Sequence, residues 1–127
     1  MHKLNFQALS LAMFCILLAV VGQTLMKLAI VRSGGMPVLE IGLGGLVRKC
    51  IEVPYILLGF GAYGVSAVLW LEVLSELDFS VAFPLVSVSY VLALFIGRYL
   101  FDESINFSRV LGVLLICSGV FFIIRSQ

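Results

Sequence analysis

Residues 69–101 read LWLEVLSELDFSVAFPLVSVSYVLALFIGRYLF and decide how the chain folds. An apolar segment runs into three acids, Glu72, Glu76 and Asp78, and a second apolar segment follows at once, with Pro84 near its start. Each segment approaches the length of about 20 apolar residues that a helix needs to cross a bilayer core. The stretch therefore predicts two membrane-spanning helices joined by a short acidic turn.

The composition of the whole chain is that of an integral membrane protein. Of its 127 residues 62% are hydrophobic and only 12% are charged, and the mean hydropathy is +1.20. Soluble domains have roughly 45–50% apolar and about 25% charged residues. The net charge of +1, with no basic cluster beyond the helix ends, argues against nucleic acid as a partner. We expect a single transmembrane domain over residues 1–127.

Four apolar runs predict an all-α bundle of four transmembrane helices. The expected ranges are about 5–31, 53–77, 79–101 and 108–125. The long connection, residues 32–52, opens with the helix stop SGGMP and continues too rich in glycine to predict a helix. Two alternatives stay open for it: an interfacial segment that lies against lipid headgroups, or an ordinary loop.

The first helix has one face that becomes more polar along its length. Ala12, Ile16, Ala19, Gln23 and Lys27 share this face at 100° per residue. Gln23 and Lys27 are candidates for substrate contact, and Ala19 is a small residue beside them. The alternative is that Gln23 hydrogen-bonds to another helix and Lys27 extends its ammonium group to the interface.

The second helix has a face of small residues that ends in carboxylates. Gly61, Gly64 and Val68 begin this face, and Glu72 and Glu76 end it. Glycine lets another backbone or a lipid chain approach, so we expect a groove there, with the two acids as substrate ligands. The alternative is close helix packing for the glycines and solvated charges at the helix end.

The third helix is predicted to be kinked. Pro84 lacks the backbone N–H that would bond to the carbonyl of Ser80. Ser87 and Arg98 lie on the same stripe as this proline, with Tyr90 at its edge, which indicates a weakly polar track for a substrate. The alternative is that the serines bond back to the preceding turn and Arg98 extends to the interface.

The last helix and the absence of known chemical motifs complete the prediction. Gly112 and Gly119 offer small packing surfaces, and four helices enclose so little space that an oligomer is expected, either a homodimer or a heterodimer with a related small subunit. The three cysteines lack CxxC spacing, and no metal cluster or phosphate loop is visible. We therefore predict no catalytic residues, no metal site, no cofactor and no enzymatic activity.

The basic residues are distributed unevenly among the connections, which predicts an orientation. Six adjoin the first and third connections, and two lie on the other side. The positive-inside tendency places the first and third connections in the cytoplasm, and both termini and the acidic turn outside. The six are Lys27, Arg32, Arg48, Lys49, Arg98 and Arg109, and the two are Lys3 and Arg125.

Nearly the whole chain resembles the four-helix members of the drug/metabolite transporter superfamily. The resemblance lies in AVVGQTLMKLA, VLWLEVLSELDFSVAFPLVSVSYV and RVLGVLLICSGVFFI, and it implies an EamA/small-multidrug-resistance-like bundle. Small multidrug resistance proteins, similar in TLMK and LICSGV, depend on a glutamate eight residues before the lysine for proton-coupled export. That position is Ala19 here, so the first helix has no acid for this exchange.

The pattern is most similar to the ArnE/ArnF-type subunits, which are assigned to flipping an undecaprenyl-phosphate-linked aminosugar. This resemblance implies a transporter subunit that flips a polyprenyl-phosphate-linked sugar across the bacterial inner membrane, with the lipid-linked sugar and membrane lipids as partners. Glu72 and the longer first connection depart from the pattern. The matching residues are Gly22, Gln23 and Lys27 in the first helix, and Ser80, Ala82, Phe83, Pro84 and Ser87 in the third.

A mechanism and two alternatives follow from these residues. Lys27 or Arg98 would attract the phosphate, the sugar hydroxyls would pass Gln23, Ser87 and Tyr90, and the carboxylates of Glu72 and Glu76 would receive an amino group. One alternative is an exporter of small cations or metabolites in which Glu72 replaces the missing acid. The other is a scaffold for a membrane glycosyltransferase.

Overall fold

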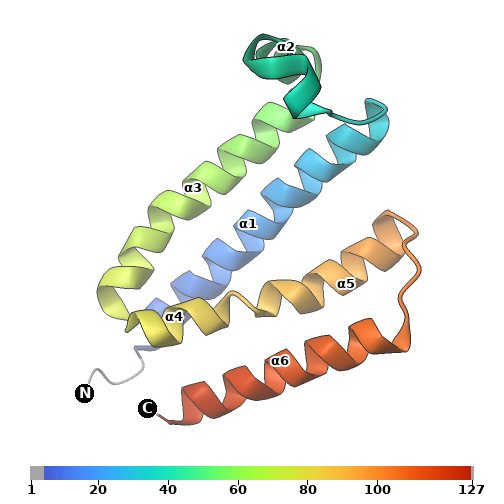
Figure 1. The fold of residues 1–127 in the computed structure, drawn as a ribbon. Helices are drawn as coiled ribbons and strands as arrows, with labels where there is room; N and C mark the ends of the chain where they lie inside the picture. Colours follow the sequence, from blue (N-terminus) through green and yellow to red (C-terminus); the bar gives the residue numbers. More distant parts are fainter. Residues whose placement is uncertain (1–4, 127) are drawn as a thin grey trace.

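The structure is a computed structural model that describes residues 5–126, and these form six helices (Figure 1). Four segments are long and apolar enough to span a membrane: Phe6–Arg32, Pro54–Glu76, Phe79–Leu100 and Phe107–Arg125. This confirms the predicted all-α bundle with four spans. Lys3, one of the two basic residues expected outside, falls beyond the described residues. The helices are α1 (Phe6–Arg32), α2 (Val38–Glu52), α3 (Pro54–Glu76), α4 (Phe79–Leu85), α5 (Val88–Leu100) and α6 (Phe107–Arg125).

Helices α1 and α3 lie side by side and form the tightly packed part of the bundle (Figure 1). A Cβ atom added at Gly22 would lie 2.6 Å from the carbonyl oxygen of Gly59, and one added at Gly59 would lie 2.6 Å from that of Gly22. The two backbones can meet there only because both residues are glycine. Ser66 of α3 is buried, and its hydroxyl donates to the carbonyl oxygen of Cys15 on α1 (2.8 Å).

The glycine face predicted for residues 53–77 is not the face that packs on α1. No other part of the described chain lies within 4 Å of a Cβ added at Gly61 or Gly64, and Val68 is exposed. The packed face instead carries Gly59 and Ser66, seven residues apart, so it lies on a different stripe of α3. Close packing within this chain is therefore excluded for Gly61 and Gly64.

Residues 38–52 form a helix, which the glycine-rich sequence did not predict, so the ordinary-loop alternative is wrong. The helix is bent at Gly42, whose φ of 63° and ψ of −172° fall in a region open almost only to glycine. The glycine content that argued against a helix thus supplies its bend. Lys49 donates to the carbonyl oxygen of Gly35 (2.8 Å), and Arg48 donates to Glu52 (2.8 Å).

The third span is divided into two helices, and at the predicted kink a tighter turn at residues 86–87 interrupts the α-helix. Helix α4 ends at Leu85, and α5 begins at Val88. Backbone bonds from Val86 to Phe83 (3.1 Å) and from Ser87 to Pro84 (3.0 Å) tighten the turn between them. The hydroxyl of Ser87 is buried there without a hydrogen-bond partner, and the residue is 8% exposed.

Helix α6 lies along α4 and α5, yet none of its described residues is buried (Figure 1). Asn106 caps it, because its side-chain oxygen accepts a hydrogen bond from the backbone N–H of Arg109 (2.9 Å). The expected packing glycines, Gly112 and Gly119, have no other part of the described chain within 4 Å of an added Cβ. Their predicted packing therefore does not occur within this chain.

Candidate functional site

The first of three adjoining cavities lies between α1, α3 and the break after α4. It has a volume of about 220 Å³ and is lined by the aromatic rings of Tyr63 and Trp70 on α3. Ala19 and Gln23 line it from α1, and Val86 lines it from the break. Apolar and aromatic groups therefore surround one amide, that of Gln23.

The second cavity lies between α1 and α5 and has a volume of about 290 Å³. Gln23 borders this cavity as well as the first, so the two adjoin at its side chain. Lys27 is one turn further along α1, Tyr90 lies on α5, and Glu103 lies in the α5–α6 connection. Polar character thus increases from the first cavity to the second.

The third cavity lies between α5 and α6 and has a volume of about 350 Å³. Tyr90 and Glu103 line it together with Arg109 and Gly112 of α6. Because Glu103 borders both the second and third cavities, its carboxylate stands where they meet.

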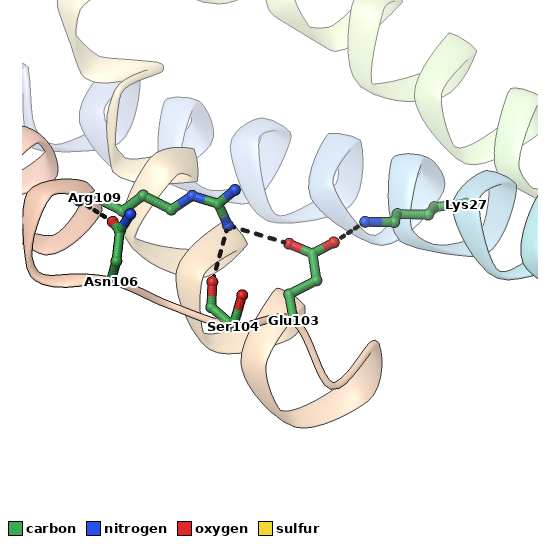
Figure 2. Close-up of polar contacts among 5 residues, drawn as sticks. All are labelled: Lys27, Glu103, Ser104, Asn106 and Arg109. Atoms are coloured by element: carbon green, nitrogen blue, oxygen red, sulfur yellow. Dashed lines mark hydrogen bonds and ion pairs between the residues drawn. The ribbon is translucent and has the colours of Figure 1, made fainter.

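An ion cluster joins α1, the α5–α6 connection and α6 (Figure 2). Lys27 Nζ donates to Glu103 Oε1, and the other oxygen, Oε2, lies 3.9 Å from Arg109 Nη1. Arg109 also donates to the backbone carbonyl of Ser104 (3.3 Å), and Lys27 lies 4.5 Å from the centre of the Phe101 ring. One carboxylate is therefore shared by two cations from different helices.

The turn after α5 brings Glu103 to this position. Asp102 has a positive φ of 51°, and the chain folds back so that the N–H of Glu103 donates to the carbonyl of Gly97 (2.9 Å). A Cβ at residue 97 would lie 2.9 Å from Glu103 Oε2. The absence of a side chain at Gly97 thus leaves room for the carboxylate.

The cluster is electropositive even with Glu103 ionised. The hydrogen bond from Lys27, followed by the charges of Lys27 and Arg109, holds the pKa of the Glu103 carboxyl below its ordinary range. Two cations and one anion leave one net positive charge on the cluster, which lies where the second and third cavities meet. This charge suits an anionic group such as a phosphate.

The structure brings together part of the residue set expected from the sequence. Ala19 and Gln23 line the first cavity, and Gln23, Lys27 and Tyr90 line the second. Gly112 lines the third. The polar face of α1 and Tyr90 of α5 thus border the same cavity.

Other expected site residues lie away from these cavities. Arg98 is exposed and its guanidinium lies 3.7 Å from the carboxylate of Asp102. Glu72 and Glu76 are exposed at the far end of α3, and Ser87 and Pro84 lie at the α4–α5 break without lining any of the three cavities. Within residues 5–126, no group of three His, Cys, Asp or Glu side chains gathers to hold a metal ion.

Sequence reasoning missed Glu103. It therefore also missed that Lys27 and Arg109 contact the same carboxylate. A signal was available, because the predicted orientation puts Lys27, Arg109 and the stretch FDESINFSR on one side of the membrane. A lysine near the end of an apolar helix favours a nearby carboxylate. The contact itself depends on the turn after α5, which no sequence periodicity predicts.

Comparison with known proteins places this chain in a family of membrane transporters. Residues 3–125 match the model of the EamA-like transporter family. A probable 4-amino-4-deoxy-L-arabinose-phosphoundecaprenol flippase subunit ArnE of Pseudomonas syringae pv. syringae (strain B728a) is 39% identical over 64 residues, which are 50% of this chain and 59% of that protein. The chain thus spans about three-fifths of the length of this relative. No solved structure matches the present chain.

Two further relatives align over longer stretches. A protein of Erwinia tasmaniensis with the same ArnE name is 32% identical over 99 residues, covering 78% of this chain and 80% of that protein. The probable flippase subunit ArnF of Aeromonas hydrophila subsp. hydrophila, named for the same lipid-linked sugar, is 32% identical over 106 residues. That alignment covers 82% of this chain and 70% of the ArnF protein.

Proposed function

Because this chain belongs to the EamA-like transporter family and is a multi-pass protein of the bacterial inner membrane, we propose that it is a subunit of a flippase for a polyprenyl-phosphate-linked sugar. The relatives' names make 4-amino-4-deoxy-L-arabinose on undecaprenyl phosphate the leading substrate. In this proposal the chain catalyses no covalent step, and it acts with a related small subunit. The second subunit would cover the surface of α6, which has no buried residue among those described.

The observation that carries the proposal is the line of polar groups from Gln23 to the ion cluster. Gln23 and Tyr90 offer hydrogen bonds to sugar hydroxyls, and Lys27 and Arg109 offer charge-assisted hydrogen bonds to a phosphate. A polyprenyl tail needs no polar partner and can stay in the surrounding hydrocarbon. The cavities therefore provide for the head of such a lipid and leave its tail outside.

Proton-coupled export of cations has less support from the same cavities. Ala19 lines the first cavity at the position where the small multidrug resistance family has its glutamate, and Glu72 lines none of the three. The ion cluster between the second and third cavities carries one net positive charge, which disfavours a cationic substrate. An anionic lipid headgroup is the better fit.

We propose a membrane-surface location for α2. After the bend at Gly42, the apolar side chains of Leu43, Val47 and Ile51 recur every four residues and are exposed, Leu43 by 82%. Arg48 and Lys49 lie between them, where they could meet anionic headgroups. A spin label at Leu43 should contact a lipid-soluble relaxation agent more than one at the exposed Glu40, and equal contact would reject this location.

The flippase proposal is tested by the sidedness of the lipid-linked aminosugar. Cells that lack this chain and its paralogues should lose labelling of the lipid by a membrane-impermeant, amine-reactive reagent. Wild-type protein, with its partner subunit, should restore the labelling. Unchanged labelling in the deletion strain would reject the proposal.

A further inference from the structure

We infer that Glu103 is an exchangeable counter-ion, which the phosphate group of a lipid-linked substrate displaces from Lys27 and Arg109. The inference rests on the proposed function, because it takes Lys27 and Arg109 as phosphate ligands. It adds a residue that controls access to this anion site. The ligand class is a phosphate mono- or diester on a prenyl chain.

The geometry of the cluster is that of an occupied anion site. Each oxygen of Glu103 faces a different cation, Lys27 on α1 and Arg109 on α6 (Figure 2). A phosphate ester also presents at least two unesterified oxygens and can bridge the same two cations. Glu103 therefore occupies the place that such a phosphate would take.

The carboxylate can leave this place without unfolding the turn. Its backbone is held by the hydrogen bond to Gly97, whereas the carboxylate is at the end of a side chain that can change rotamer. The side chains of Lys27, Glu103 and Arg109 are 49%, 36% and 55% exposed, so a ligand can reach all three. Ion pairs as accessible as these contribute little stability, and exchanging one anion for another costs correspondingly little.

The position of Glu103 between two cavities gives the exchange a role in transport. With no substrate, the carboxylate pairs with Lys27 and Arg109 and competes with other anions for them. When a phosphate enters, the carboxylate turns away from Lys27 and Arg109 into one of the two cavities that Glu103 borders. Its negative charge next to the bound phosphate then favours release of the substrate, because like charges at close range repel.

The test measures binding of farnesyl phosphate to the full chain in nanodiscs of zwitterionic lipid by calorimetry. Glu103→Gln removes the competing charge, and Gly97→Ala displaces the carboxylate but keeps its charge. Both should tighten the Kd for farnesyl phosphate, by roughly three- to tenfold. Glu40→Gln, which removes an exposed acid from α2, should leave it unchanged.

Two controls identify the site and the ligand. Lys27→Ala in the Glu103→Gln background should abolish the gain. Inorganic phosphate should bind more weakly than farnesyl phosphate in every variant, since it has no prenyl chain to bury. Equal affinity for the two would show a site for free phosphate and would overturn the assignment to a lipid-linked ligand.

A purely structural role of Glu103 predicts that the two variants do not bind farnesyl phosphate more tightly than wild type. If Glu103 only fastens the connection to α1, then Glu103→Gln and Gly97→Ala should weaken binding or leave it unchanged, and either result overturns the inference. Absence of farnesyl phosphate binding in wild type and Glu103→Gln alike would also overturn it. If the predicted tightening occurs but the aminosugar sidedness assay fails, the sugar assignment is rejected and the counter-ion role stands.

Discussion

The α1–α3 pair and the α4–α6 layer are both built from apolar helices, yet they pack very differently. Helices α1 and α3 meet backbone to backbone at Gly22 and Gly59, whereas α6 has no buried residue among those described. In lipid, apolar side chains gain little by leaving hydrocarbon for each other, so small residues and hydrogen bonds decide which helices pack closely. The first pair is therefore a packed scaffold that also lines the first two cavities, and the α4–α6 layer, with its connections, borders all three.

The ion cluster is the place where the two regions are connected by charge. Lys27 belongs to the α1–α3 pair, and Glu103 and Arg109 belong to the α4–α6 layer. If the α1–α3 pair holds the fold and the ion cluster binds substrate, variants in the cluster should change transport with little effect on folding. Variants at the α1–α3 contact should lower stability, with little direct effect on the transport step.

The largest effect is expected for Lys27→Ala. Losing a charge-assisted contact to phosphate should lower transport roughly 10- to 100-fold, since such bonds contribute about 1.5–3 kcal/mol. Outward labelling of the lipid-linked aminosugar measures this, and membrane insertion should be normal. Arg125→Ala, at the end of α6 and outside the three cavities, is the matched control. Equal transport in the two variants would contradict a functional role for the cluster.

The second prediction concerns the packed pair and compares two glycines of α3. Gly59→Ala would place a Cβ 2.5 Å from Met26 Cγ and 2.6 Å from the Gly22 carbonyl, so the helices must separate. We expect the free energy of unfolding to fall by about 1–3 kcal/mol. Gly61→Ala meets nothing within 4 Å and should leave it nearly unchanged. Unfolding titrations in detergent measure both variants. Equal losses of unfolding free energy would show that the Gly22–Gly59 contact does not contribute specially to stability.

The sequence predicts the four spans, the kink at Pro84 and the polar face of α1, because each depends on local pattern. Long apolar runs determine spans, proline removes a specific hydrogen bond, and Gln23 and Lys27 share a face by helical periodicity. These features need no knowledge of which helices are neighbours.

What the sequence does not predict depends on contacts between distant residues. Small residues occur on two faces of α3, and only the partner decides that Gly59 packs and Gly61 does not. Glycine weakens a helix prediction, yet α2 forms with a bend at Gly42, where the non-helical backbone angles suit glycine. Glu103 meets Lys27 across 76 residues through a turn that requires a positive φ at Asp102.

A smaller effect is expected from a hydrogen bond inside the packed pair. Ser66→Ala removes the bond from α3 to the Cys15 carbonyl and should cost about 0.5–1.5 kcal/mol of unfolding free energy. Ser118→Ala is the comparison in α6, because that hydroxyl donates to Leu114 of its own helix (2.8 Å). The α6 variant should lose less stability. A larger loss for Ser118→Ala would argue that α6 is the more tightly held helix.

The smallest effect should come from acid titration of the link between the two regions. The pKa of Glu103 is lower in the folded chain than its ordinary value, so its contribution to stability is complete above that value and is lost as pH falls through the lowered one. The apparent Tm should therefore fall by a few degrees at most between about pH 5 and pH 3.

The Glu103→Gln variant isolates this contribution from the other acids of the chain. It should have a lower Tm than wild type at neutral pH, and the difference between the two should shrink toward pH 3, because protonation gives wild type the same neutral side chain. High salt should also reduce the difference, since the pair is exposed. A difference that is constant with pH and salt would mean that Glu103 connects the two regions by packing. Its carboxylate would then not be the charged group that joins α1 to α6.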